Sequence, residues 1–183
     1  MSTNKHLRDM LYSALFAALI AVLGLIAIPV SFLPAPITGQ TLGVMLAGAI
    51  LTTRQTALGI STFLALGIAG VPVFALGQGG LSILGGPRGG FLIGFLIGGI
   101  VITLLRGKSN NVKNVGISCL IGGVLVIYAI GIPWMSYSLK GSLFSIPVFL
   151  SSIVYVPFDI VKVFIASWVS VKVRKQLPHL ATS

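Results

Sequence analysis

The chain has 183 residues, of which 56% are hydrophobic and 8% are charged, and its mean hydropathy is +1.08. These values lie far from those of soluble domains, so we predict an integral membrane protein and exclude a water-soluble fold. The net charge of +10 would indicate a nucleic-acid partner in a soluble protein. The positions of the basic residues along the chain distinguish a nucleic-acid-binding surface from charges that follow the membrane topology.

Apolar segments separated by short polar or Gly/Pro breaks predict six transmembrane helices. A span needs about 20 residues, or fewer where a helix is short. We do not expect the first segment to be a cleaved signal peptide, since similar segments follow it along the chain. We therefore predict one all-α membrane domain over residues 1–183. The predicted helices cover residues 10–28, 40–53, 56–71, 89–105, 112–132 and 147–171.

Small residues recur at a spacing of four in the first predicted helix. Ala14 and Ala18 form one stripe, and Ala17 and Ala21 form the adjoining one. Small residues at this spacing allow another helix to approach closely in lipid. The approaching helix could belong to a partner protein or to the bundle itself.

Two loops on the same side are unusually apolar. The stretch "IPVSFLPAPITGQT" carries Pro29, Pro34 and Pro36 and no charge, and we expect it to fold back on the bundle as a cover. The stretch "GVPVFALGQGGLSILGGPRGGF" contains eight glycines before its final phenylalanine. Irregular backbone at membrane depth persists only where protein or a cavity satisfies its polar groups, so we expect this loop to turn inward and line a site.

Arg88 precedes the predicted start of a helix near Gly89. A guanidinium beside a helix N-terminus favours a carboxylate. The alternative is an interfacial arginine that reaches lipid headgroups. A phosphate-binding loop is not indicated, because Ile102 occupies the position of the first glycine in the segment that ends "RGKSN".

The segment "PFDIVK" places a charged pair inside an apolar run. Asp159, one of two acidic residues in the chain, shares a helix face with Lys162, and Pro157 loosens the backbone before them. A charge at the bilayer centre costs about 2.5–3.5 kcal/mol. The pair could be a structural salt bridge, but apolar residues would serve stability as well, so we favour binding of a small polar ligand whose apolar body contacts Phe74 and Tyr155.

The basic residues gather on one side of the predicted topology. With both termini in the cytoplasm, nine lie in cytoplasmic tails and loops, two lie outside, and Lys162 belongs to neither side, in agreement with the positive-inside rule. The positive net charge therefore reflects the membrane topology, and no nucleic-acid partner is needed to explain it. The nine are Lys5, Arg8, Arg54, Arg106, Lys108, Lys113, Lys172, Arg174 and Lys175, and the two are Arg88 and Lys140.

Four stretches together resemble the BioY family, the biotin-specific substrate-binding subunits (S components) of energy-coupling factor (ECF) transporters. They are "PAPITGQTLGVMLAG", "GIAGVPVFALGQGG", "GGPRGGFLIGFLIG" and "PFDIVK". The resemblance covers effectively the whole chain, and the motifs follow the family's order. It implies a six-helix subunit in a prokaryotic cell membrane that captures biotin from outside. It also implies a partner module of two ATPases and a membrane coupling protein, contacted through Ala14 and Ala18.

The resemblance also implies roles for individual residues. Asp159 and Lys162 match the family's D-x-x-K pair, and Gln78 lies where relatives carry a polar or basic residue. Arg88 departs from the family's "GPTGG" or "GPSGG" pattern, in which a small hydroxyl side chain occupies this position. Biotin offers a ureido group, an apolar bicycle and a carboxylate. We expect Asp159 and Gln78 to hydrogen-bond it, Lys162 or Arg88 to bind its carboxylate, and the proline loop with Gln40 and Thr41 to act as a lid.

Two other classes of function are considered. In a proton-coupled secondary carrier for a small carboxylate-bearing vitamin, Asp159 would bind the coupling proton. An enzyme is not expected, because His6 and His179 lie in the tails and the single cysteine, Cys119, lies within a span. We predict no metal site and no cofactor, with biotin as the transported ligand.

Overall fold

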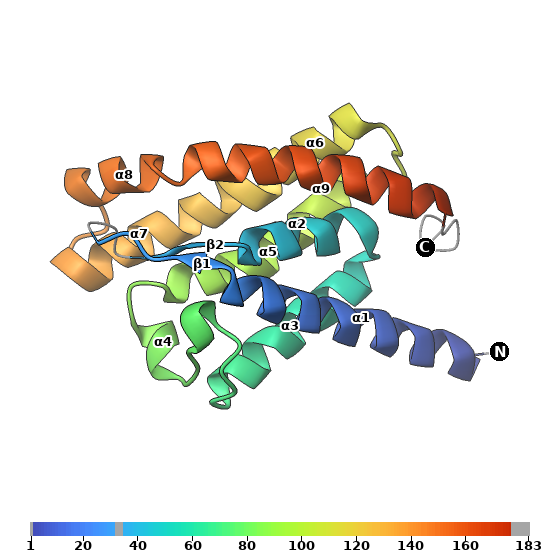
Figure 1. The fold of residues 1–183 in the computed structure, drawn as a ribbon, viewed down its shortest axis with the longest axis horizontal. Coiled ribbons are helices and arrows are strands. Elements are labelled where there is room, and N and C mark those ends of the chain that lie inside the picture. Colours follow the sequence, from blue (N-terminus) through green and yellow to red (C-terminus); the bar gives the residue numbers. More distant parts are fainter. Residues whose placement is uncertain (1, 32–34, 177–183) are drawn as a thin grey trace.

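The protein is described by a computed structural model that covers residues 2–31 and 35–176; Pro34 and His179 lie outside the described residues. The all-α prediction is confirmed, since long helices make up most of the described chain (Figure 1). The one sheet in that part of the chain is a two-residue antiparallel pairing, Ala27 with Thr38 and Ile28 with Ile37. Its strands flank the proline-rich loop.

Each predicted apolar segment is helical over most of its length. The elements in chain order are α1 (Ser2–Leu25), β1 (Ala27–Ile28), β2 (Ile37–Thr38), α2 (Gln40–Ile50), α3 (Thr53–Ile68), the 3₁₀ turn η1 (Ala75–Gly77), α4 (Ser82–Gly85), α5 (Gly89–Arg106), α6 (Val112–Leu120), the π-helical segment η2 (Ile121–Val126), α7 (Ile127–Lys140), α8 (Ile146–Ile153) and α9 (Val156–Gln176).

The structure divides the predicted helix over residues 147–171 into two. The axes of α8 and α9 differ by 44° across Val154 and Tyr155. Pro157 explains the break, because proline lacks an N–H and its ring excludes a preceding helical turn, whereas it is tolerated in the first turn of a new helix. The predicted helix over residues 112–132, in contrast, continues as α6, η2 and α7 to Lys140.

Not every helix is long enough to cross a bilayer. Three helices within the described residues meet the length and hydropathy expected of a span, and the bent pair of α8 and α9 would be a fourth. Helix α2 has 11 residues and α3 has 16. The structure therefore supports a membrane protein, whereas the number of six spans stays a prediction.

The two ends of the bundle differ in charge and in secondary structure. The N-terminal end of α1, the turn between α2 and α3, the α5–α6 loop and the C-terminal end of α9 lie at one end (Figure 1). These segments carry nine of the twelve basic residues. Strands β1 and β2, α4 and α8 lie at the opposite end. We name the first the basic end and the second the hairpin end.

Glycines allow α5 to pack closely on its neighbours. A Cβ on Gly122 would lie 2.6 Å from the Gly98 carbonyl oxygen, and a Cβ on Gly48 would lie 2.8 Å from that of Gly99. Such distances are too short for a side chain, so η2 and α2 approach α5 at backbone contact.

Candidate functional site

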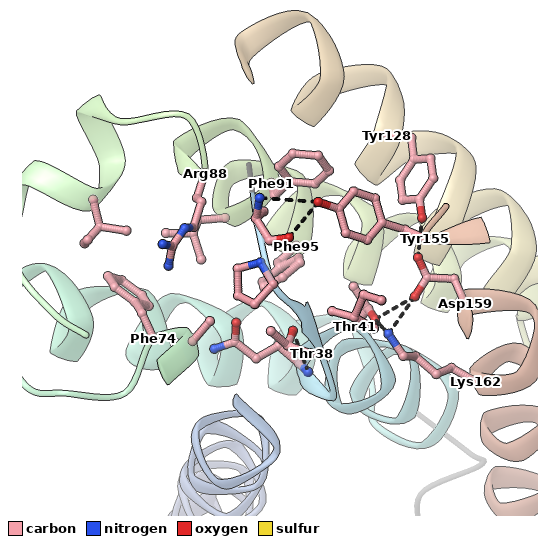
Figure 2. A pocket seen from close by; sticks show the side chains of 17 residues that line it. Thr38, Thr41, Phe74, Arg88, Phe91, Phe95, Tyr128, Tyr155, Asp159 and Lys162 are labelled. Carbon is pink, nitrogen blue, oxygen red and sulfur yellow. Dashed lines mark hydrogen bonds and ion pairs between the residues drawn. The ribbon is translucent and has the colours of Figure 1, made fainter. Parts of the chain in front are cut away.

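A cavity lies at the hairpin end, enclosed by segments far apart in sequence (Figure 2). Residues 35–38 and the first turn of α2 form one side, and the glycine-rich segment 70–88 forms another. Helices α5, α7 and α9 complete the wall with Phe91, Phe95, Tyr128 and other side chains. Both predicted loops therefore contribute to a cavity, as expected.

The charged pair of α9 lies in the wall of this cavity. Lys162 Nζ donates to Asp159 Oδ1 at 2.8 Å and to Thr41 Oγ1 at 2.8 Å, while Thr41 Oγ1 donates to the same carboxylate oxygen at 3.0 Å. Tyr128 donates its hydroxyl to the other oxygen, Oδ2. The Asp159 side chain is 4% exposed and that of Lys162 is 14% exposed, so the lysine side chain is the more accessible of the two.

The local structure restricts the positions of the Asp159 and Lys162 side chains. Asp159 lies in the first turn of α9, where the partial positive charge of the helix N-terminus favours a carboxylate. Lys162 follows one turn later on the same face. Thr41 lies in the first turn of α2 and connects both charges. Two helix N-terminal regions and α7 therefore converge on one carboxylate.

The bend between α8 and α9 directs Tyr155 toward the proline-rich loop. Its hydroxyl donates to the Ala35 carbonyl oxygen at 2.6 Å and accepts from the Ala35 N–H at 3.3 Å. Tyr155 is only 8% exposed. This paired contact fastens residues 35–38 over the cavity, which fits the expected role of that loop as a cover.

The glycine-rich segment contributes the second cation. Arg88 lines the cavity, and its Nη1 donates to Gln78 Oε1 at 2.9 Å. Phe74, 2% exposed, reaches the cavity from the same segment. Gly67 makes room for it, because a Cβ there would lie 2.1 Å from Phe74 Cζ. The segment therefore turns inward, as predicted, and α5 begins at Gly89.

The cavity has an excess of positive charge. Asp159 and Lys162 neutralise each other, whereas Arg88 has no carboxylate within salt-bridge distance among residues 5–31 and 35–176. A low-dielectric wall of aromatic and aliphatic side chains strengthens the field of an unneutralised cation. The site is suited to a ligand that carries one negative charge and an apolar body.

Seven of the eight predicted site residues line the cavity: Asp159, Lys162, Arg88, Gln40, Thr41, Phe74 and Tyr155. The eighth, Gln78, does not line it and contacts it only through Arg88. The sequence reasoning missed Tyr128, Thr38, Phe91 and Phe95. A tyrosine within an apolar helix is itself a signal, since a buried hydroxyl needs a partner, but the identity of that partner depends on the fold.

The structure separates the two alanine stripes of α1. Ala17 is 4% exposed and belongs to the core, whereas Ala14 and Ala18 are exposed. Large apolar side chains surround these two alanines on the exposed face, including Leu11, which is 63% exposed. The Ala14 and Ala18 stripe is therefore available to a partner helix, and the Ala17 stripe packs inside the bundle.

The described residues contain no group of three or more His, Cys, Asp or Glu side chains that could hold a metal ion. The cavity carries one carboxylate, and its other polar groups are hydroxyls, an amide and two cations. Such a donor set suits hydrogen bonding to an organic anion.

The comparisons with known proteins agree on one family. The model of the BioY family matches residues 1–179. A protein of Rhizobium etli described as "Biotin transporter BioY" is 38% identical over 169 residues, which is 87% of this chain and 89% of that protein. A "Probable biotin transporter BioY" of Bacillus subtilis is 36% identical over 172 residues, with 92% and 91% covered. A crystal structure described as the S-component for biotin from an ECF-type ABC transporter superposes with a TM-score of 0.88 at 31% identity, covering 96% of this chain and 95% of that one.

Proposed function

The chain belongs to the BioY family, and we propose that it is the biotin-binding S component of an ECF transporter. The observation that carries the proposal is the Asp159–Lys162 pair in the wall of a cavity that also holds an unneutralised arginine. Named relatives are biotin transporters, and this function is transport and not catalysis.

The groups of biotin correspond to the groups of the cavity. Asp159 Oδ1 already accepts two hydrogen bonds and Oδ2 accepts one, which leaves a lone pair on Oδ2 for a ureido N–H, since a carboxylate offers about four acceptor positions. Lys162 Nζ uses two of its three N–H groups, so the third can bind the ureido carbonyl. The fused rings then rest on Phe91 and Phe95.

Arg88 is the proposed partner of the biotin carboxylate. Its guanidinium is oriented by Gln78 at 2.9 Å and carries the charge that the cavity does not neutralise. An arginine binds a carboxylate through two parallel N–H groups. This assignment gives biotin one orientation, with the ureido group toward α9 and the carboxylate toward the glycine-rich segment.

The proposed topology has six spans with both termini in the cytoplasm of a prokaryotic cell. Helix α2 would be about 16 Å long at 1.5 Å per residue, so it crosses the bilayer only together with the irregular segment before it. Irregular backbone at that depth is tolerated where it lines a cavity. The nine basic residues at one end favour that end as cytoplasmic.

The energy source is proposed to be a separate module of two ATPases and a membrane coupling protein. The chain carries no phosphate-binding loop, and the exposed stripe of Ala14 and Ala18 would allow a helix of the coupling protein to approach closely. A proton-coupled carrier would instead work without such a module.

The test combines binding with uptake. The detergent-extracted protein should copurify with biotin, and calorimetry with the ligand-free protein should give one tight site. Uptake by reconstituted transporter should stop when the ATPases lose their nucleotide-binding lysines and should continue with a protonophore. Uptake that collapses with the protonophore and persists without ATPases would establish the secondary carrier instead.

A further inference from the structure

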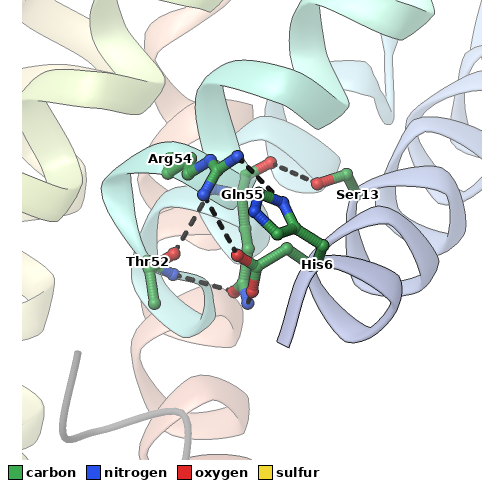
Figure 3. Close-up of polar contacts among 6 residues, drawn as sticks. His6, Ser13, Thr52, Arg54 and Gln55 are labelled. Atoms are coloured by element: carbon green, nitrogen blue, oxygen red, sulfur yellow. Dashed lines mark hydrogen bonds and ion pairs between the residues drawn. The ribbon is translucent and has the colours of Figure 1, made fainter. Parts of the chain in front are cut away.

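The second acidic residue of the chain lies at the basic end, far from the cavity along α1. Asp9 is 5% exposed, and its Oδ1 accepts a hydrogen bond from Gln55 Nε2 at 2.7 Å (Figure 3). Its Oδ2 lies 3.9 Å from Arg54 Nη1, whose side chain is 59% exposed. An ion pair at this distance with a solvated partner contributes little, so the buried amide is the main partner of Asp9.

Gln55 uses all its polar groups at the junction of α1 with the start of α3. It is 1% exposed. Its backbone N–H and its Oε1 form a reciprocal capping box with Thr52, its carbonyl oxygen accepts from Ser13 Oγ at 3.1 Å, and its Nε2 donates to Asp9. The turn that begins α3 is thereby bonded to α1 at two positions one helical turn apart.

Near Gln55 the two helices approach at backbone distance, because a Cβ on Gly59 would lie 2.9 Å from the Ser13 carbonyl oxygen. Farther along, Ala17 and Ile20 of α1 pack in one apolar cluster with Ile60 and Phe63 of α3. Apolar burial is non-directional, whereas a directional polar contact is a known device for fixing one register. A buried carboxylate adds little stability over an apolar side chain, which leaves orientation as its distinctive contribution.

We infer that Asp9, held by Gln55, is a positioning residue for transport that fixes the rotation of α1 about its own axis. Residues 9 and 13 face α3, and this orientation points Ala14 and Ala18 away from the bundle. A shift of α1 by one residue would turn it by about 100° and remove the alanine stripe from its outward position. The inference rests on the proposed docking of the coupling protein on that stripe.

The test compares Asp9→Leu with Asp9→Asn. Leucine fills the space without an acceptor, whereas asparagine keeps an oxygen for Gln55 Nε2 and removes the charge. Three quantities are measured for each variant: biotin affinity of the isolated subunit, biotin uptake by the reconstituted transporter, and the spin-label distance distribution between Leu7→Cys and Leu58→Cys. Both labelling positions are exposed, at 56% and 41%, and the native Cys119 is 0% exposed.

Asp9→Leu should reduce uptake at least tenfold, broaden or shift the distance distribution, and leave biotin affinity within about threefold of the original. Asp9→Asn should behave as the original protein in all three measurements. Original uptake in Asp9→Leu would overturn the inference, and so would a parallel loss of affinity and uptake, which is the result of a general loss of fold. Failure of Asp9→Asn to restore uptake would overturn it as well, since the charge and not the contact would then matter.

Substitution of the docking stripe separates this inference from the proposed function. If Ala14→Trp abolishes uptake and Asp9→Leu does not, the positioning role is wrong and the docking surface stands. If Ala14→Trp leaves uptake unchanged, the docking surface itself is wrong, and the positioning role for transport is overturned with it.

Discussion

Lys162 Nζ lies 2.8 Å from Asp159 Oδ1, and both side chains face the same cavity as Arg88. A salt bridge is therefore compatible with the proposed ligand site in this protein. Lys162 donates to Asp159, and Thr41 and Tyr128 hold the carboxylate in place. One N–H of the ammonium stays available, so the pair can bind a ligand without first breaking.

Replacement of Lys162 by alanine should weaken biotin binding by about 30-fold or more. The change removes a ligand donor, and truncating one partner of a buried hydrogen-bonded pair costs about 2–5 kcal/mol. The fold should persist, because Thr41 and Tyr128 still donate to Asp159. Calorimetry measures the affinity, and Lys140→Ala serves as a control at the hairpin end. Unchanged affinity in Lys162→Ala would make the pair purely structural.

Arg88→Ala should weaken binding of free biotin and leave binding of biotin methyl ester nearly unchanged. The guanidinium is proposed to meet the carboxylate, and the ester has no charge to lose. A drop of about 10- to 100-fold for the free acid follows from the loss of one charge-assisted hydrogen-bonded contact. Equal weakening of acid and ester would show that Arg88 does not contact the carboxylate and instead supports Gln78 and the glycine-rich segment.

Tyr128→Phe tests a cavity residue that the sequence analysis did not identify. The ring should keep its edge-to-face contact with Phe91, at 6.3 Å between centroids, while Asp159 loses its hydrogen bond on Oδ2. A hydrogen bond to a charged group contributes about 1.5–3 kcal/mol, so we expect affinity to fall roughly tenfold or more by calorimetry. Tyr137→Phe, at a position 62% exposed, is the matched control and should have no effect.

Gly67→Ala should displace Phe74 from the cavity wall. The new Cβ would overlap the phenylalanine ring, which also packs edge-to-face on Phe63 at 5.5 Å and has little room to move. We expect lower biotin affinity and a lower unfolding temperature. Gly116→Ala is the control, since its Cβ would meet Ser167 Cβ at an ordinary 3.7 Å. Original affinity in Gly67→Ala would show that Phe74 does not shape the site.

Ala14→Trp and Ala18→Trp should abolish uptake while calorimetry on the isolated subunit shows unchanged biotin binding. Both residues are exposed, so tryptophan fits without disturbing the bundle and only obstructs a partner helix. Ala17→Trp is the informative contrast, because Ala17 is 4% exposed and the large ring should disrupt folding. Loss of binding in all three variants would show that Ala14 and Ala18 pack in the core together with Ala17.

The amino-acid sequence predicts the membrane class, the approximate positions of the helical segments and seven of the residues that line the cavity. A membrane protein can be recognised from its sequence because a span needs a long apolar segment and because arginine and lysine gather in the cytoplasmic loops. Asp159 and Lys162 were conspicuous for the same reason, since charges are costly and rare in such segments. Gln78 is predicted as a site residue but does not line the cavity, because a loop position does not reveal which way a side chain turns.

Which side chains meet depends on the tertiary fold. Tyr128 is 31 residues from Asp159 and Thr41 is 118 residues away, yet both donate to its carboxylate. It also decided which alanine stripe faces outward, and it showed that the helix carrying the charged pair begins at a 44° bend. Such contacts depend on how the helices cross and rotate against one another. The spacing of apolar residues along one helix does not describe that geometry.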